Sequence, residues 1–184
     1  VASSTRDKIM ANQEVMDIAL ALGVALGKNF DVADLRYDKV IIMTDADVDG
    51  AHIAALLMTL FFTEMPELVR AGHLYLAQPP LYRLSHGGKT LYALDDAQRE
   101  ALRAEFPANA KVDMGRFKGL GEMNAKDLKD TTMNPATRQL ARVRLPETEA
   151  DAADLFSRLM GKKAEPRFQF IQDNAAFAQD ALDL

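Results

Sequence analysis

The sequence TDADVDGAHI, from Thr44 to Ile53, places three aspartates at alternate positions directly after the apolar run Val40 to Met43. That run is short and rich in β-branched residues, which predicts a strand buried in a parallel sheet. The segment from Gly50 onward is apolar almost all round, which predicts a buried helix straight after the acids. Because like charges this close repel one another, something must make the acidic cluster tolerable.

Two interpretations of the acids involve no catalysis. An EF-hand calcium loop matches the pattern D-x-D-x-D-G that begins at Asp45. However, that loop needs a bidentate glutamate at its twelfth position, where this chain has Leu56, and a helix rather than a strand before it. A purely structural role, with Asp49 capping a helix, explains one acid but not three.

A magnesium site explains the whole cluster. Ligands of α/β folds bind at the carboxyl ends of parallel strands, where these acids are expected to lie. Mg²⁺ prefers a few carboxylates together with water and phosphate oxygens, and an open acidic turn supplies them. The bound cation would also relieve the repulsion among the aspartates. The turn therefore predicts phosphate chemistry supported by a divalent cation.

The remaining pattern alternates between helices and strands, without an internal repeat. A strand, a helix and a strand are expected at 39–44, 50–65 and 73–77, which predicts a βαβ unit in an α/β fold. A hairpin is expected between 81–84 and 89–94. Further expected elements are a helix over 12–26 stopped by Gly27, a helix from Asp95 or Asp96 to Phe106, a strand over 111–117, a helix capped by Asn124, a helix opened by Thr148 and a last helix around Phe170 to Phe177.

The composition is that of one globular domain with or without an appendage, at 184 residues, 48% hydrophobic and 27% charged. The absence of cysteine excludes disulfides and thiolate metal sites. The apolar stretch Ile53 to Phe62 is too short to span a bilayer, so no membrane partner and a cytoplasmic location are expected. Because the chain begins at Val1 without a methionine, we expect a fragment of a longer protein.

The net charge of −5 is unevenly distributed. From Lys111 to Arg144 there are eight basic residues against four acids. Most such charges belong to solvated helix faces, but a local basic face can also meet a phosphate backbone. A nucleic-acid partner therefore stays open despite the acidic balance of the chain.

Three long motifs in a fixed order resemble one known family. TDADVDGAHI is followed by HLYLAQPPLYRL (His73 to Leu84) and then by RFKGLGEMN (Arg116 to Asn124). Together they resemble the Toprim half of the ATPase subunit of bacterial type IIA DNA topoisomerases, the B subunits of gyrase and topoisomerase IV. The resemblance implies an α/β Toprim fold, Rossmann-like with a parallel sheet and flanking helices, truncated at its N-terminus and followed by an α+β tail. The implied division is a Toprim domain over 1–84 and a C-terminal tail region over 85–184.

The resemblance implies a site for two Mg²⁺ ions, in which Mn²⁺ or Ca²⁺ can substitute. Asp45 and Asp47 are the implied ligands, and Asp49 is a weaker ligand or a helix cap. A glutamate that completes the family's site is absent here and is expected before Val1. The nucleophilic tyrosine is implied to belong to the partner A subunit, so the four tyrosines of this chain are expected to be core or strand residues.

The resemblance also implies residues that contact DNA. These are His52 beside the metal, Arg116 and Lys118 in RFKGLGEMN, and Arg167 in AEPRFQFIQDN. Glu122 is implied to join the metal or drug-binding neighbourhood, where quinolone-type inhibitors would act.

The same residues have plainer interpretations. His52 alone is typical of a histidine at a helix start, and Arg167 of a surface arginine on a helix. RFKGLGEMN is by itself a loop between a strand and a helix. In that loop, Gly119 and Gly121 are expected to permit backbone shapes closed to other residues.

The implied activity is the passage of one DNA duplex through a cut in another by a heterotetramer of two A and two B subunits on the chromosome. ATP is implied to bind only in a domain that this chain lacks, so the chain alone is expected to be inactive. The short interval before RFKGLGEMN disfavours only those gyrases that carry a large insertion there, whereas FIQDNAAF and AALLMTLFF resemble topoisomerase IV more than gyrase. A non-catalytic cation-binding module and a scaffold that docks the A subunit stay open as alternatives.

Overall fold

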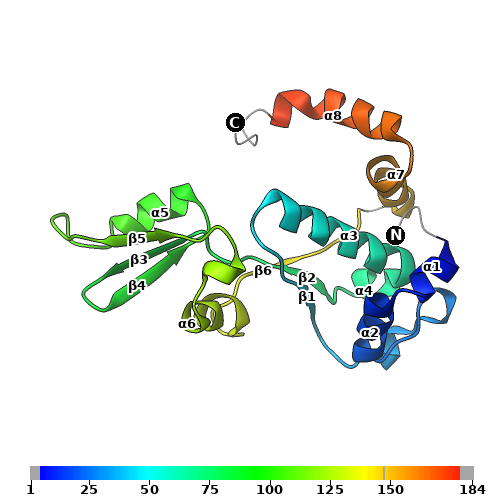
Figure 1. Cartoon of the computed structure of the whole chain (residues 1–184), viewed down its shortest axis with the longest axis horizontal. Coiled ribbons are helices and arrows are strands. Elements are labelled where there is room, and N and C mark those ends of the chain that lie inside the picture. The colour runs from blue at the N-terminus through cyan, green and yellow to red at the C-terminus, as the bar shows by residue number, and fades with distance from the viewer. Residues whose placement is uncertain (1–4, 147, 179–184) are drawn as a thin grey trace. The chain divides into compact units, whose positions relative to one another are not determined.

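A computed structural model describes residues 5–146 and 148–178 of the chain (Figure 1). The described residues form two compact units whose segments alternate along the sequence. The first unit draws on 1–38, 56–73 and 144–184, and the second on 39–55 and 74–143. The acidic turn and the RFKGLGEMN loop therefore belong to the same unit, the second.

The second unit contains the strand that leads into the acids. β1 (Val40–Ile42) pairs in parallel with β2 (Leu74–Ala77), and β2 pairs antiparallel with β6 (Leu140–Arg142). The strands predicted over 39–44 and 73–77 and their parallel pairing are confirmed. β1 is less buried than predicted, because two of its three residues are half-buried. β6 has no counterpart among the predicted elements, since Leu-Ala-Arg shows no strand pattern of its own and is held by its ladder to β2.

α3 (Val48–Glu64) begins within the acidic motif, two residues earlier than predicted. Oδ1 of Asp47 accepts a 2.7 Å hydrogen bond from the backbone N–H of Gly50, so Asp47 caps the helix. The capping role expected for Asp49 therefore falls to Asp47. Asp49 lies in the first turn instead, where its negative charge favours the positive end of the helix dipole.

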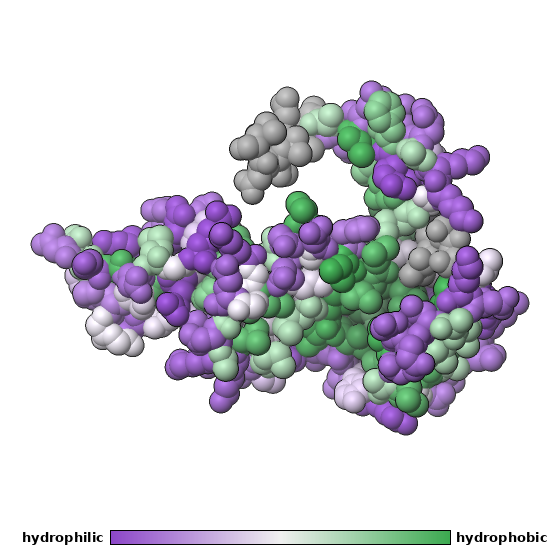
Figure 2. Space-filling model, in the orientation of Figure 1, coloured by the Kyte–Doolittle hydropathy of each residue, from purple (hydrophilic) through white to green (hydrophobic). Residues whose placement is uncertain are grey.

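The predicted burial of α3 is only partly right. Leu60 and Phe61 are buried, with 2% and 3% of their surface exposed. Nearer the acids, Val48 is 84% exposed and Ile53 is 50% exposed. On the face shown in Figure 2, hydrophobic residues gather over the part of the chain that holds α3. The amino-terminal part of this helix thus leaves an apolar surface uncovered beside the acidic turn.

A second three-stranded sheet, in the order β4-β3-β5, completes this unit. β3 (Tyr82–His86) pairs antiparallel with both β4 (Lys89–Ala93) and β5 (Asp113–Arg116). Gly87 and Gly88 form the two-residue turn of the predicted hairpin, with φ of 57° and 84°. Both values lie in the left-handed region that a type I′ turn requires and that glycine adopts without steric cost.

α5 (Asp96–Arg103) packs against this second sheet (Figure 1). Asp95, one of the two predicted caps, accepts a 2.7 Å hydrogen bond from the backbone N–H of Gln98. The helix ends before the predicted Phe106, which is nevertheless buried in the core beneath it. That core contains Tyr82, Leu84, Ala93 and Phe106.

The described part of the first unit is helical. Gly23 has a φ of 79° and ends α2 at Leu22, so the predicted continuation to residue 26 is wrong. The two predicted C-terminal helices are confirmed. None of the described helices is long and apolar enough to cross a membrane. Besides the carboxyl-terminal part of α3, this unit holds α1 (Arg6–Met10), α2 (Gln13–Leu22), α4 (Pro66–Arg70), α7 (Glu149–Met160), α8 (Ala164–Ala178) and 3₁₀ turns at Gly27–Asn29 and Val32–Asp34.

Candidate metal and DNA site

Asp45 and Asp47 lie exposed in the turn between β1 and α3, and Asp49 is exposed in the first turn of α3. Within the described residues, Asp45, Asp47 and Asp49 form no ion pair. Their mutual repulsion is therefore not relieved by a described basic side chain. A cavity of about 360 Å³, lined by Asp45 and mainly apolar residues, opens where β1 and β2 end. This is the edge at which α/β folds place their ligands.

The RFKGLGEMN loop contacts the first of these acids, Asp45. The backbone N–H of Leu120 donates a 2.7 Å hydrogen bond to Oδ1 of Asp45. A Cβ placed on Gly119 would lie only 2.9 Å from Cγ of Asp45. Two motifs 75 residues apart in the sequence thus meet at one carboxylate.

The glycines of this loop have a different role from the one predicted. Gly119 is extended, with φ of −164° and ψ of 174°, and Gly121 has no positive φ. The prediction that both residues permit unusual backbone shapes is therefore wrong. A Cβ on Gly119 would displace the Asp45 carboxylate from its present position, whereas a Cβ on Gly121 would meet nothing within 4 Å.

The polar side chains of the loop are exposed. Oε2 of Glu122 accepts a 2.8 Å hydrogen bond from the backbone N–H of Lys118, which braces the 3₁₀ turn Leu120–Glu122. Lys118 forms no ion pair with any described residue, so its ammonium group is available to a phosphate. The role of Glu122 beside the metal stays a prediction.

The other predicted DNA contacts come from three different elements. The guanidinium carbon of Arg116, on β5, lies 6.0 Å from the centre of the Tyr82 ring on β3. His52 is exposed on α3. Arg167 belongs to the first unit, where its guanidinium donates a 2.9 Å hydrogen bond to the carbonyl of Gly161. The DNA-binding roles of all three residues stay predictions.

The donors in the turn suit a loosely held magnesium ion. Within 5–146 and 148–178, no three His, Cys, Asp or Glu side chains converge into a group that could hold a metal. Asp45 and Asp47 each use one carboxylate oxygen in a backbone hydrogen bond and keep the other free of described partners. Mg²⁺ is commonly bound through one or two carboxylates, with water and phosphate oxygens as its further ligands. The residues present therefore fit a partial, solvent-open magnesium site.

Comparison with known proteins assigns the two halves of the chain. A family model described as "Toprim domain" matches residues 2–79, and one described as "DNA gyrase B subunit, carboxyl terminus" matches residues 109–172. The chain is 58% identical over 184 residues to the B subunit of DNA topoisomerase 4 from Caulobacter vibrioides, a match that covers 100% of the chain and 26% of that relative. The chain therefore matches, along its whole length, a segment of a topoisomerase B subunit.

Other B subunits show the same partial overlap. The topoisomerase 4 B subunit of Bartonella bacilliformis is 53% identical over 98% of the chain and 26% of its own length. The DNA gyrase B subunit of Treponema denticola is 45% identical over 97% of the chain and 28% of its own length. The chain thus spans about a quarter of the length of these relatives. The predicted division of this B-subunit segment after residue 84 lies between the two family matches and stays a prediction.

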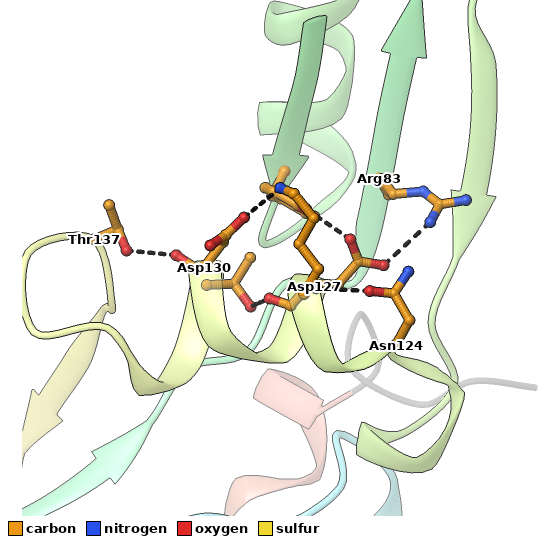
Figure 3. Close-up of polar contacts among 8 residues, drawn as sticks. Arg83, Asn124, Asp127, Asp130 and Thr137 are labelled. Carbon is orange, nitrogen blue, oxygen red and sulfur yellow. Dashed lines mark hydrogen bonds and ion pairs between the residues drawn. The ribbon is translucent and has the colours of Figure 1, made fainter. Parts of the chain in front are cut away.

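A buried polar network follows the loop in this B-subunit segment and was not predicted. α6 (Ala125–Leu128) begins at Asn124, which accepts a 2.8 Å hydrogen bond from the backbone N–H of Asp127, as predicted for a cap. The carboxylate of Asp127 is buried and accepts hydrogen bonds from Arg83 at 3.1 Å and from Tyr92 at 2.7 Å (Figure 3). This carboxylate ties α6, and with it the end of RFKGLGEMN, to the β3–β4 hairpin.

The residues after α6 extend this network. A π-helix, Lys129–Met133, follows directly, and such irregular turns are frequent at functional sites. Within it, the hydroxyl of Thr131 donates a 2.8 Å hydrogen bond to the carbonyl of Asp127. The hydroxyl of Thr137 donates to the carbonyl of Asp130 (Figure 3). No sequence signal indicates these contacts, because each polar residue alone is ordinary in a helix or turn.

The network makes Tyr92 the subject of a pH prediction. Burial, the hydrogen bond to Asp127 and the negative charges of Asp127 and Asp130 raise the pKa of Tyr92 from 10.0 to about 12, against an opposing effect of Arg83. Because the folded-state pKa is raised, this contribution to stability is complete below pH 10 and is lost as the pH rises toward 12. Ultraviolet titration of tyrosinate should show a late-titrating component that Tyr92→Phe removes.

Tyr37→Phe is the matched control for that titration. Tyr37 is 54% exposed, so its replacement should leave the late component in place. If Tyr92→Phe removed a component near pH 10 instead, the assigned hydrogen bond to Asp127 would be wrong.

Proposed function

We propose that this chain is the metal-binding Toprim part of a topoisomerase IV B subunit. It would supply Mg²⁺ for cleavage and religation of double-stranded DNA by a tyrosine of the A subunit. The observation that carries this proposal is the exposed turn at Asp45 and Asp47. Neither acid forms an ion pair with a described residue, and the backbone of RFKGLGEMN donates a hydrogen bond to Asp45. One oxygen of each carboxylate is held by a backbone N–H, and the other has no described partner and is open to a cation, whose charge would relieve the repulsion between the acids.

The residues of the turn have defined tasks in this proposal. Asp45 and Asp47 would hold the cation through the oxygens not engaged by backbone N–H groups. When bound, divalent cations would stabilise the leaving 3′ oxygen of DNA and anchor a neighbouring phosphate. His52, Arg116 and Lys118 would contact the DNA backbone, which positions a duplex without reading its sequence.

The proposed chemistry explains why the cut can be resealed. The tyrosine oxygen of the A subunit would form a bond to phosphorus while the bond from phosphorus to the 3′ oxygen breaks, and overall the proton of the tyrosine hydroxyl passes to the 3′ oxygen. One phosphodiester is exchanged for another, so the reverse attack by the 3′ oxygen restores the strand. ATP would act only in a domain outside this chain, within an assembly of two A and two B subunits.

Topoisomerase IV is favoured over gyrase by the comparisons. Identity is 58% and 53% to two topoisomerase 4 B subunits and 45% to a gyrase B subunit. Gyrase is the second candidate, because that gyrase B subunit also matches 97% of the chain.

Reconstitution of the full-length B subunit with its A subunit tests the proposal. We expect the assembly to unlink catenated DNA circles in the presence of ATP and Mg²⁺, and EDTA to abolish both unlinking and cleavage. Negative supercoiling of relaxed DNA would instead assign the protein to gyrase. Cleavage that persists with EDTA, or cation binding without any cleavage, would overturn the catalytic proposal and favour the binding-module or scaffold alternatives.

A further inference from the structure

The carboxylate of Asp45 is held from one side by the loop that follows β5. Leu120 supplies a hydrogen-bond donor to Oδ1 at 2.7 Å, and Gly119 supplies the space in which the carboxylate carbon lies. These are separate contributions, because one depends on a backbone N–H and the other on the absence of a side chain. Both contributions come from the backbone, so the side-chain types of the loop do not indicate them.

The loop that makes these contacts is anchored at both ends. The backbone N–H of Phe117 donates a 2.8 Å hydrogen bond to the carbonyl of Leu81, and the side chains of Phe117 and Met123 are buried. Glu122 ties the middle of the loop to the N–H of Lys118. The segment that faces Asp45 is therefore held by contacts on both sides of it.

We infer that Gly119 and Leu120 are positioning residues that orient the Asp45 carboxylate for its divalent cation. This inference rests on the proposed function of Asp45 as a metal ligand. An exposed aspartate samples several rotamers, and fixing one of them costs conformational entropy when a cation binds. A support that fixes Oδ1 beforehand removes part of that cost and leaves the other oxygen for the metal. Groups that orient a metal ligand in this way typically change metal affinity by about 10- to 100-fold.

Two glycines of the same loop provide a matched pair of variants. In Gly119→Ala, the new Cβ would press against Asp45, with 2.9 Å to both Cγ and Oδ1, and would displace the carboxylate. In Gly121→Ala, the new Cβ meets nothing within 4 Å. The probe is Mn²⁺ alone, titrated into nucleotide-free, full-length B subunit and followed by electron paramagnetic resonance of the free ion. We expect Gly119→Ala to bind Mn²⁺ at least about tenfold more weakly than the wild type, and Gly121→Ala to match the wild type.

A second pair isolates the hydrogen bond in case Gly119→Ala does not fold. Leu120 begins a 3₁₀ turn and follows an extended residue, so proline is compatible with both the turn start and the preceding backbone. Leu120→Pro removes the N–H donor, whereas Leu120→Ala removes the side chain and keeps the donor. The ratio of the two Mn²⁺ affinities therefore measures the hydrogen bond, and we expect it to be about tenfold or more. Hydrogen exchange of β3 and β4 serves as the folding control.

The outcomes separate this inference from the proposed function. If Asp45→Asn binds Mn²⁺ as tightly as the wild type, the turn is not the metal site and the proposed function fails with the inference. If Asp45→Asn weakens binding but Gly119→Ala and Leu120→Pro do not, Asp45 is a ligand that needs no support and the inference alone is overturned. Weakening by Gly119→Ala and Leu120→Pro relative to their matched variants, in folded protein, supports it.

Discussion

Replacing Asp45 by asparagine is expected to lower Mg²⁺-dependent DNA cleavage by at least about 100-fold in the reconstituted assembly of A and B subunits. The amide oxygen of asparagine can still accept the hydrogen bond from Leu120, so the contact with RFKGLGEMN is kept. What is lost is the negative charge and the carboxylate oxygen that is free of described partners. The loss therefore reports on cation binding and not on the loop. Gel quantification of covalent complexes between DNA and the A subunit over a series of Mg²⁺ concentrations measures it.

Asp49→Asn is the control for this variant. It also removes one negative charge from the acidic motif, but Asp49 lies in the first turn of α3, whereas the loop's hydrogen bond goes to Asp45. Its effect should stay below about tenfold, because an exposed charge that is not a ligand acts on the cation only through water, which is worth about 1 kcal/mol at about 4 Å. Equal losses in the two variants would show that only the summed charge of the turn matters, and the assignment of Asp45 as a ligand would then fail.

Much of the secondary structure of the second unit was predictable because its signals are local. Asp95 and Asn124 each cap a helix by accepting a backbone hydrogen bond from three residues ahead. Gly87 and Gly88 specify a tight hairpin through their positive φ angles. In each case the residues that carry the signal also make the contact, so reading a few neighbouring positions is enough.

The arrangement of the site itself was less predictable, because it depends on pairings between distant segments. β6 is a strand only through its ladder with β2, and the buried carboxylate of Asp127 is satisfied by Arg83 and Tyr92, which lie 44 and 35 residues away. A polar residue in a short helix gives no sign of such partners. The resemblance to the topoisomerase family named the acidic turn and the RFKGLGEMN loop. It did not reveal which backbone atom of the loop touches which acid.

The glycines show the same limit most clearly. Gly23 and Gly72, which lie outside the three motifs or at their edge, have positive φ and fit the general expectation that glycine supplies unusual backbone angles. The motif glycines Gly119 and Gly50 have another reason to be small, because a different part of the chain lies where a Cβ would be. Sequence alone does not separate these two reasons, since both require a glycine in the same kind of loop.

Gly50→Ala is expected to disrupt the acidic turn from within. A Cβ on Gly50 would lie 2.1 Å from the backbone carbonyl oxygen of Asp45, and no side-chain rotation can relieve a clash with backbone. The turn between β1 and α3 would have to open, and the 2.7 Å hydrogen bond from Gly50 to Asp47 would be strained or lost. Overpacking of this kind costs about 1–3 kcal/mol, and a backbone contact belongs at the upper end of that range. Because Asp45 and Asp47 stand in this turn, metal binding should fall together with local stability.

Hydrogen exchange measured by mass spectrometry on peptides that cover 39–57 tests this expectation, because it reports the local opening of the turn within a multidomain subunit. A cost of about 2 kcal/mol should speed exchange there roughly 30-fold, while peptides from β3 and β4 keep the wild-type rate. Gly115→Ala is the matched control, because a Cβ at that strand position would meet nothing within 4 Å. Wild-type exchange in Gly50→Ala would mean that the turn has room for a side chain. The presence of Gly50 would then have to be explained by a molecule that binds the turn and not by packing within the turn.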